Sequence, residues 1–171
     1  MNALAGRKIA KVSGTPGKTR MLNVYCMPQA EPVGAQHAAP LHDAGYYFLD
    51  LPGYGWARAS QSDRAAFRRL ITQALHRPRL AGVLWLLDVR RDPSDEDRDL
   101  QDQFAAGATR ILAAITKSDK VQRALTLRRE RELRAALQLD EDQAIVTSAR
   151  TGAGIDELRE AVAALVREAV E

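Results

Sequence analysis

The sequence contains a single cysteine, Cys26, in 171 residues. One cysteine excludes an intramolecular disulfide and any metal site built from several thiolates, as is typical of proteins from a reducing cytoplasm. The chain also lacks an uninterrupted apolar run near the ~18–20 residues of a transmembrane helix, and its first residues lack the apolar core of a secretory signal. These absences predict a cytoplasmic protein with no membrane span.

The overall composition is that of an ordinary globular protein. Hydrophobic residues make up 46% of the chain and charged residues 27%, and the length suits one domain with a buried core. The formal net charge is +3. This mildly basic balance is compatible with an RNA-rich partner but, taken alone, is a weak indication of one.

Apolar runs alternate with segments of helical spacing, and this order predicts an α/β domain with a mostly parallel sheet. The run at 82–88 is apolar up to its final aspartate, which is typical of a central parallel strand covered on both faces. Ser94 is placed to cap a helix that Gly107 can end, and residues 28–43 are expected to form a solvated inserted loop. Strands are expected at 21–27, 46–50, 82–88, 111–115 and 144–146, and helices at 64–75, 95–106, 121–139 and 155–170.

The first motif with a chemical meaning is Asp50-Leu51-Pro52-Gly53, directly after an expected strand. Asp50 can hold a magnesium-bound water, and the Gly53 amide can approach a γ-phosphate because no Cβ intervenes. Loss of that phosphate would release the Gly53 segment, which is how a switch works. By itself the motif is equally well explained as a strand that ends in a Pro-Gly turn.

The second motif, Thr116-Lys117-Ser118-Asp119, suits recognition of guanine. Guanine presents its N1 and N2 donors side by side, and one carboxylate, that of Asp119, can accept from both. Adenine has an acceptor at N1 and no 2-amino group, and a buried polar mismatch of that kind costs ~1–3 kcal/mol or more. Lys117 can lay its alkyl stem over the purine face. The alternative is a strand that runs into a Ser-Asp helix start.

The third motif, Thr147-Ser148-Ala149, follows the last expected strand. Its small residues would let a backbone amide reach the purine O6. Such a short string is common, so its value comes from its order and spacing after the first two motifs.

Gly14-Thr15-Pro16-Gly17-Lys18-Thr19 resembles a phosphate-binding P-loop only superficially. A P-loop needs four residues between its glycines and a helix after its lysine, whereas this stretch has two residues and then an expected strand. A first switch loop, with the Thr19 hydroxyl on magnesium, is the better interpretation. An ordinary Pro-Gly turn is the alternative.

Together these residues resemble one family, the bacterial EngB-type GTPases of the translation-factor-related branch of P-loop GTPases. Its most specific parts are the string Asp-Leu-Pro-Gly-Tyr-Gly and the Asp-x-Arg segment. The matching segments are Thr15 to Thr19, Asp50 to Ala57, Asp88-Val89-Arg90 with Pro93 and Asp97, Thr116 to Lys120, and Gly152 to Leu158.

The resemblance implies a single Ras-like G domain over residues 1–171, three-layered as α/β/α, that binds GTP or GDP with Mg²⁺ and works as a monomer. It implies assistance in assembling the large ribosomal subunit, through rRNA and ribosomal proteins, with a link to normal cell division and septation. The predicted metal ligand is Thr19. The predicted nucleotide-binding residues are Gly17, Lys18, Thr19, Arg20, Met21, Asp50, Leu51, Pro52, Gly53, Thr116, Lys117, Ser118, Asp119, Thr147, Ser148 and Ala149.

Two departures from the family pattern bear on activity. Tyr54 stands where many G domains carry a water-orienting glutamine, so intrinsic hydrolysis is expected to be slow. The P-loop and the first strand that should precede Asn2 are also missing, and we expect that the sequence is a truncated form of a longer protein. The alternative is an adaptor that binds ribosomes or proteins without nucleotide.

The expected helix at 121–139 is rich in arginine. An ion-paired, solvated face is favoured there over an rRNA-binding patch, because acidic residues alternate with the basic ones. The residues concerned are Arg123, Arg128, Arg129, Arg131 and Arg134, with Glu130 and Glu132.

Overall fold

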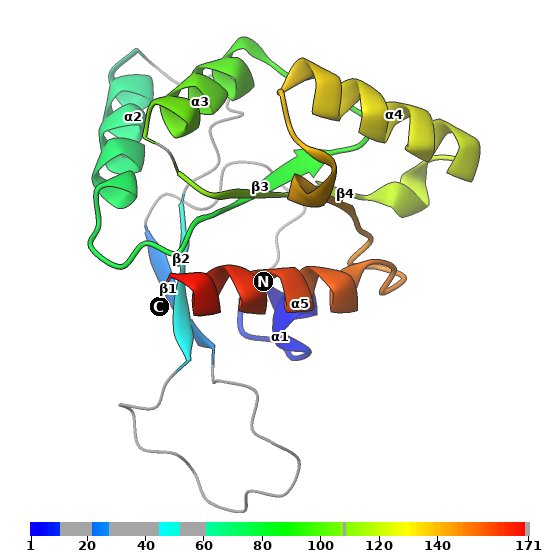
Figure 1. The fold of residues 1–171 in the computed structure, drawn as a ribbon, viewed down its shortest axis with the longest axis horizontal. Coiled ribbons are helices and arrows are strands. Elements are labelled where there is room, and N and C mark those ends of the chain that lie inside the picture. Colours follow the sequence, from blue (N-terminus) through cyan, green and yellow to red (C-terminus); the bar gives the residue numbers. More distant parts are fainter. Residues whose placement is uncertain (11–21, 28–44, 52–60, 108, 170–171) are drawn as a thin grey trace, which may run out of the picture. The chain divides into compact units, whose positions relative to one another are not determined.

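The computed structural model describes residues 1–10, 22–27, 45–51, 61–107 and 109–169 (Figure 1). By their internal contacts they form two compact units, Met1–Thr72 and Gln73–Glu171. Helix α2 (Gln61–Leu75) crosses the boundary between them in sequence. In the described part of the chain, no helix is long and apolar enough to cross a membrane.

The first unit contains a short helix, α1 (Asn2–Ala5), and a two-stranded antiparallel sheet of β1 (Asn23–Met27) and β2 (Tyr46–Asp50). The expected strand at 46–50 is confirmed residue for residue. The expected strand at 21–27 is shorter at its start, and Met21 lies outside the described residues. Asn2 ties α1 to the following chain, because its Oδ1 accepts from the amides of Ile9 and Ala10 at 2.9 and 2.7 Å.

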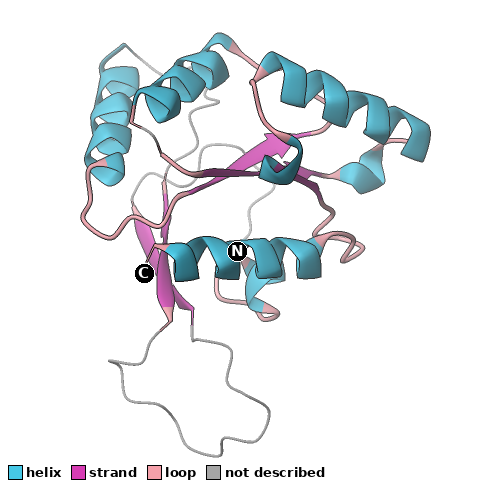
Figure 2. Cartoon of the chain, in the orientation of Figure 1, coloured by secondary structure: helices cyan, strands magenta, loops and turns pink. Residues whose placement is uncertain are grey.

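The second unit is built on a parallel three-stranded sheet in the order β3 (Val83–Asp88), β4 (Ile111–Thr116) and β5 (Ala144–Val146). Figure 2 shows helices following each strand, and α3 (Asp95–Ala106) and α4 (Arg123–Ala136) lie on the opposite side of the sheet from α5 (Ile155–Glu168). This arrangement confirms the α/β class with a parallel sheet.

The core of the second unit is centred on β4. Ala113, Ala114 and Ile115 are fully buried, as expected for a strand with a partner on each side and a helix over each face. Helix α5 is amphipathic. Its apolar face is formed by Ile155, Leu158 and Val162, which recur at helical spacing and are buried.

Strand β3 departs in part from the expectation that both of its faces are covered. Trp85 and Leu87 are buried, with the Trp85 ring 5.5 Å from that of Phe104 on α3. Leu86 points to the other face and is 60% exposed. Helix α5 lies on that face of the sheet and contacts β4.

The start of α3 confirms the predicted cap. The hydroxyl of Ser94 accepts from the amide of Asp97 at 3.2 Å, and the Asp97 carboxylate accepts from the Ser94 amide at 2.8 Å. This reciprocal pair is a capping box, and Gly107 is the C-cap residue, as expected.

Replacing Ser94 by alanine is expected to lower the free energy of unfolding by about 1 kcal/mol, because it leaves the amide of Asp97 without its acceptor. Urea denaturation measures the change. Ser94→Thr, which keeps the hydroxyl, should remain close to wild type, and an equal loss in both variants would contradict the capping role.

Candidate functional site

The strand ends that carry the second and third predicted motifs lie at one edge of the second unit's sheet. Asp88 is aligned with Thr116 in the parallel pairing of β3 with β4. Beyond β5, the amide of Thr147 donates to the carbonyl of Ile115 at 2.8 Å. The amide of Ser118 then donates to the Thr147 carbonyl at 3.1 Å, which joins the loops that leave β4 and β5. The two predicted base-recognition motifs are therefore neighbours in the fold.

Lys117 makes the turn at the end of β4. Its φ of 63° lies in the left-handed region, which is unfavourable for a side chain other than glycine. The turn leads into the short 3₁₀ helix η2 (Ser118–Lys120). Thr116 anchors the strand end, since its hydroxyl donates to the Leu87 carbonyl at 2.9 Å. Strain held in this way by the surrounding structure is typical of ligand-binding positions.

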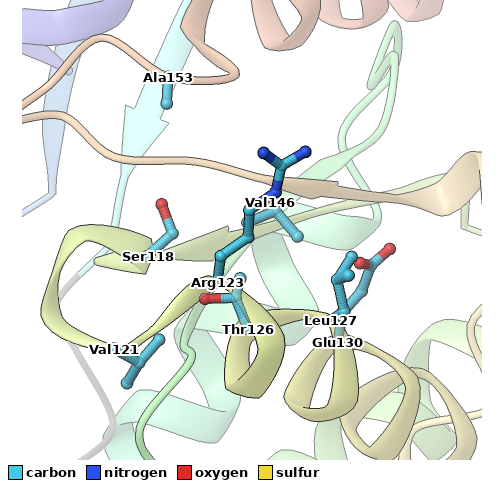
Figure 3. A pocket seen from close by; sticks show the side chains of 8 residues that line it. All are labelled: Ser118, Val121, Arg123, Thr126, Leu127, Glu130, Val146 and Ala153. Carbon is cyan, nitrogen blue, oxygen red and sulfur yellow. The ribbon is translucent and has the colours of Figure 1, made fainter.

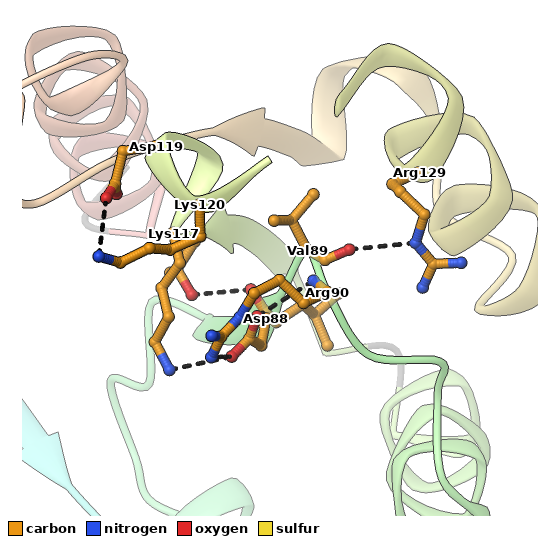
Figure 4. A network of polar contacts seen from close by, with 9 residues as sticks. Asp88, Val89, Arg90, Lys117, Asp119, Lys120 and Arg129 are labelled. Carbon is orange, nitrogen blue, oxygen red and sulfur yellow. Dashed lines mark hydrogen bonds and ion pairs between the residues drawn. The ribbon is translucent and has the colours of Figure 1, made fainter. Parts of the chain in front are cut away.

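The ammonium of Lys117 is held by Asp88, at 2.9 Å from Oδ2 (Figure 4). Arg90 binds the same carboxylate with its guanidinium, Nε to Oδ1 at 2.9 Å and Nη2 to Oδ2 at 2.8 Å. The bonds from Arg90, and after them the bond from Lys117, keep the pKa of Asp88 well below its ordinary value although partial burial opposes this. Asp88 is thus a permanent anion that positions Lys117.

Asp119, the predicted guanine-reading residue, has a side chain that is only 5% exposed. Its Oδ1 accepts from the hydroxyl of Ser148 at 2.6 Å, and its Oδ2 accepts from Nε of Arg150 at 2.7 Å. The Lys120 ammonium is 3.6 Å from Oδ2. The bond from Ser148, followed by that from Arg150, lowers the pKa of Asp119 to about 2, so the carboxylate is charged at neutral pH.

Ser148 is held in place from several sides and is fully buried. Its amide donates to the Ala153 carbonyl and its carbonyl accepts from the Gly152 amide, both at 2.9 Å. Its hydroxyl oxygen accepts from the amide of Thr151 at 3.2 Å. With that acceptor position occupied, the hydroxyl proton is directed to Asp119. The loop after β5 therefore fixes the orientation of the carboxylate.

The arginine-rich helix α4 is partly what the sequence predicts. Ion pairs between Arg128 or Arg129 and Glu132, at 3.2 and 2.6 Å, confirm an ion-paired face. Arg129, however, is not a solvated member of it, since its side chain is only 14% exposed. Its guanidinium donates to the carbonyls of Val89 and Arg91, at 3.1 and 2.7 Å, and so fastens α4 to the loop after β3.

Among the predicted nucleotide-binding residues that precede β3 in the sequence, two are described. Asp50 and Leu51, at the end of β2, belong to the first unit and are half-buried. The remaining ones, Gly17, Lys18, Thr19, Arg20, Met21, Pro52 and Gly53, are outside the described residues.

The predicted magnesium site consists of Thr19 and Asp50. Among the described residues, no group of three or more His, Cys, Asp or Glu side chains is placed to hold a metal ion. The hydroxyl of Thr19 and the carboxylate of Asp50 are oxygen donors of the kind that Mg²⁺ prefers, so the donor chemistry fits. Of the two, only Asp50 is described.

Two contacts of this site were not expected from the sequence. The sequence places Asp88 in the Asp-x-Arg family segment, and the signal for its role as an anchor for Lys117 is an aspartate at the end of an apolar strand, two residues before an arginine. Arg150 directly follows the third motif, but the sequence gives no sign that its side chain folds back onto Asp119, 31 residues away.

A pocket of about 370 Å³ lies on the α4 side of the same loops (Figure 3). Among the predicted nucleotide-binding residues that the structure describes, Ser118 alone lines this pocket, so it is distinct from the predicted base site around Asp119. Its wall is largely apolar, with Arg123 and Glu130 as the charged members. The lining residues are Ser118, Val121, Arg123, Thr126, Leu127, Glu130, Val146 and Ala153.

Comparison with known proteins agrees with the motifs. Residues 1–117 match the family model described as 50S ribosome-binding GTPase. The chain is 41% identical over 170 residues to a probable GTP-binding protein EngB of Gemmatimonas aurantiaca, covering 97% of this chain and 75% of that protein. It is 34% identical over 168 residues to one of Syntrophomonas wolfei, covering 97% and 79%.

A solved structure supports the fold. The crystal structure of a probable GTP-binding protein engB is similar with a TM-score of 0.69 at 15% sequence identity, and the match covers 98% of this chain and 90% of that one. At this identity the likeness concerns the fold alone.

Proposed function

The chain belongs to the family of 50S ribosome-binding GTPases, and on this premise we propose that it binds GTP and GDP and assists assembly of the large ribosomal subunit. Large-subunit rRNA and ribosomal proteins are then its partners, the cytoplasm is its place of action, and normal cell division and septation depend on it. We propose further that residues 1–171 act as one G domain and as a monomer. The family match across residues 1–117, which spans the boundary between the two units, supports a single domain.

The observation that carries the nucleotide assignment is the placement of Asp119. Its charged carboxylate is nearly buried beside the ends of β4 and β5, and the Ser148 hydroxyl at 2.6 Å sets its direction. Guanine offers N1–H and N2–H as parallel donors, which one carboxylate accepts together. Adenine would place the lone pair of N1 against it, at a cost of ~1–3 kcal/mol or more. The site therefore suits guanine and rejects adenine.

Lys117 supports the same assignment. Its ammonium is anchored to Asp88, which leaves its half-exposed alkyl stem next to the base-recognition loop. Apolar stems of this kind cover flat purine faces while the charge stays hydrated. Asp88 and Arg90 are then positioning residues for the base site.

The phosphate side of the proposal rests on Thr19, Asp50 and Gly53. Thr19 would ligate Mg²⁺ directly, Asp50 would hold a water of the metal, and the Gly53 amide would donate to the γ-phosphate. When bound, the metal neutralises phosphate charge. Slow intrinsic hydrolysis is expected because Tyr54 cannot polarise a water molecule.

The direct test is titration of fluorescent GDP and ADP into this chain and into a version extended by the upstream in-frame codons, which would carry any P-loop. We expect saturable binding of GDP by the extended form and at least about tenfold weaker binding of ADP, the equivalent of one buried polar mismatch. Absence of GDP binding in both forms would refute the proposal and leave the nucleotide-free adaptor.

A further inference from the structure

The two oxygens of Asp119 have partners of different kinds. Oδ1 accepts from Ser148, which is fully buried and fixed by bonds to Thr151, Gly152 and Ala153. Releasing it would require the whole loop after β5 to open. Ser148 is therefore a permanent partner that orients the carboxylate.

Oδ2 has a removable partner. The side chain of Arg150 is 65% exposed although its Nε is 2.7 Å from Oδ2. A long, solvated arginine loses little when it turns out into water, because an exposed guanidinium is already hydrated. The Lys120 ammonium at 3.6 Å is too distant for a hydrogen bond and does not replace it.

The guanidinium of Arg150 also resembles the donor edge of the guanine base chemically. The N1–C2–N2 edge of guanine is itself a guanidine unit that presents N–H donors in one plane, as an arginine side chain does. In the structure, Arg150 thus gives Asp119 the type of donor that the base would bring. A carboxylate oxygen that already accepts a charge-assisted bond is a poorer acceptor for an incoming neutral donor.

We propose that Arg150 is an intramolecular competitor of the guanine base: its guanidinium bonds to the base-reading carboxylate of Asp119 and must leave it when the nucleotide binds. This rests on the proposed function, since it presupposes that Asp119 reads guanine. Its consequence is that Arg150 lowers guanine affinity and keeps the nearly buried carboxylate satisfied between binding events.

The experiment compares GDP affinity of wild type, Arg150→Ala and Arg150→Lys in the extended form and in this chain. Arg150→Ala is expected to bind GDP about three- to tenfold more tightly, the equivalent of one partly exposed charge-assisted bond. Arg150→Lys keeps the charge without the planar fork and should fall in between. The ratio of wild-type to Arg150→Ala dissociation constants should approach one as NaCl is raised, because salt screens the competing pair.

Arg98→Ala is the matched control, since it removes the same charge from an exposed ion pair with Asp95 on α3. It should leave GDP affinity unchanged, and thermal unfolding checks that each variant is folded. If wild type binds GDP and Arg150→Ala binds equally or more weakly, the competition is refuted while the guanine site stands. If no variant binds GDP, both the guanine assignment and the competition fall.

Discussion

Replacing Asp119 by asparagine is expected to weaken GDP binding by about a hundredfold and to transfer the preference to xanthosine diphosphate. The asparagine amide puts an N–H₂ group against a donor of guanine, and the charge-assisted bond is lost as well; together these amount to ~3 kcal/mol. Xanthine carries a carbonyl at C2 in place of the amino group, so it accepts the bond that the asparagine offers. Competition titrations with both diphosphates measure the exchange.

Asp156→Asn is the control for this substitution. It makes the same chemical change on α5, where the side chain is 86% exposed and pairs with Arg159 on its own helix. Its GDP affinity and its selectivity should equal those of wild type. An Asp119→Asn protein that still prefers guanosine would remove Asp119 from its assigned role.

Those features of the second unit that follow from the order of strands and motifs along the chain could be predicted from the sequence. Carboxyl ends of parallel strands meet at one edge of a sheet, so motifs that follow 111–115 and 144–146 could be expected to lie together. The hydrogen bond between Ser148 and Asp119 confirms that the two motifs lie together. The bounds of β5 and the cap at Ser94 followed equally from local pattern.

Features that depend on side-chain direction or on covering elements could not be predicted in this way. The return of Arg150 onto Asp119 is a choice among many rotamers of a long side chain, and nothing in its local sequence selects it. Leu86 reads as buried in an apolar run, but its exposure depends on which elements cover that face of β3. Lys117 adopts a left-handed turn that sequence rules reserve for glycine.

Gly154 links the stability of the second unit to its base site, and Gly154→Ala is expected to lower the free energy of unfolding by more than about 3 kcal/mol. Its φ of +67° is strained for alanine, and a Cβ there would lie 2.1 Å from the Val146 carbonyl oxygen. That carbonyl is backbone at the end of β5, so the clash is relieved only if the strand end moves. Urea denaturation followed by circular dichroism measures the loss.

Gly152→Ala separates the clash from the strain. Gly152 has a φ of +84° in the same loop, but a Cβ there would meet no atom within 4 Å, so only the left-handed strain of ~1–2 kcal/mol applies.

Displacement of Val146 also shifts Ser148, two residues on, and with it the orientation of Asp119. Gly154→Ala should therefore weaken GDP binding under conditions where it is still folded, whereas Gly152→Ala should bind as wild type does. Equal losses of stability in both variants would show that the backbone conformation, and not the close approach to β5, is what requires glycine at 154.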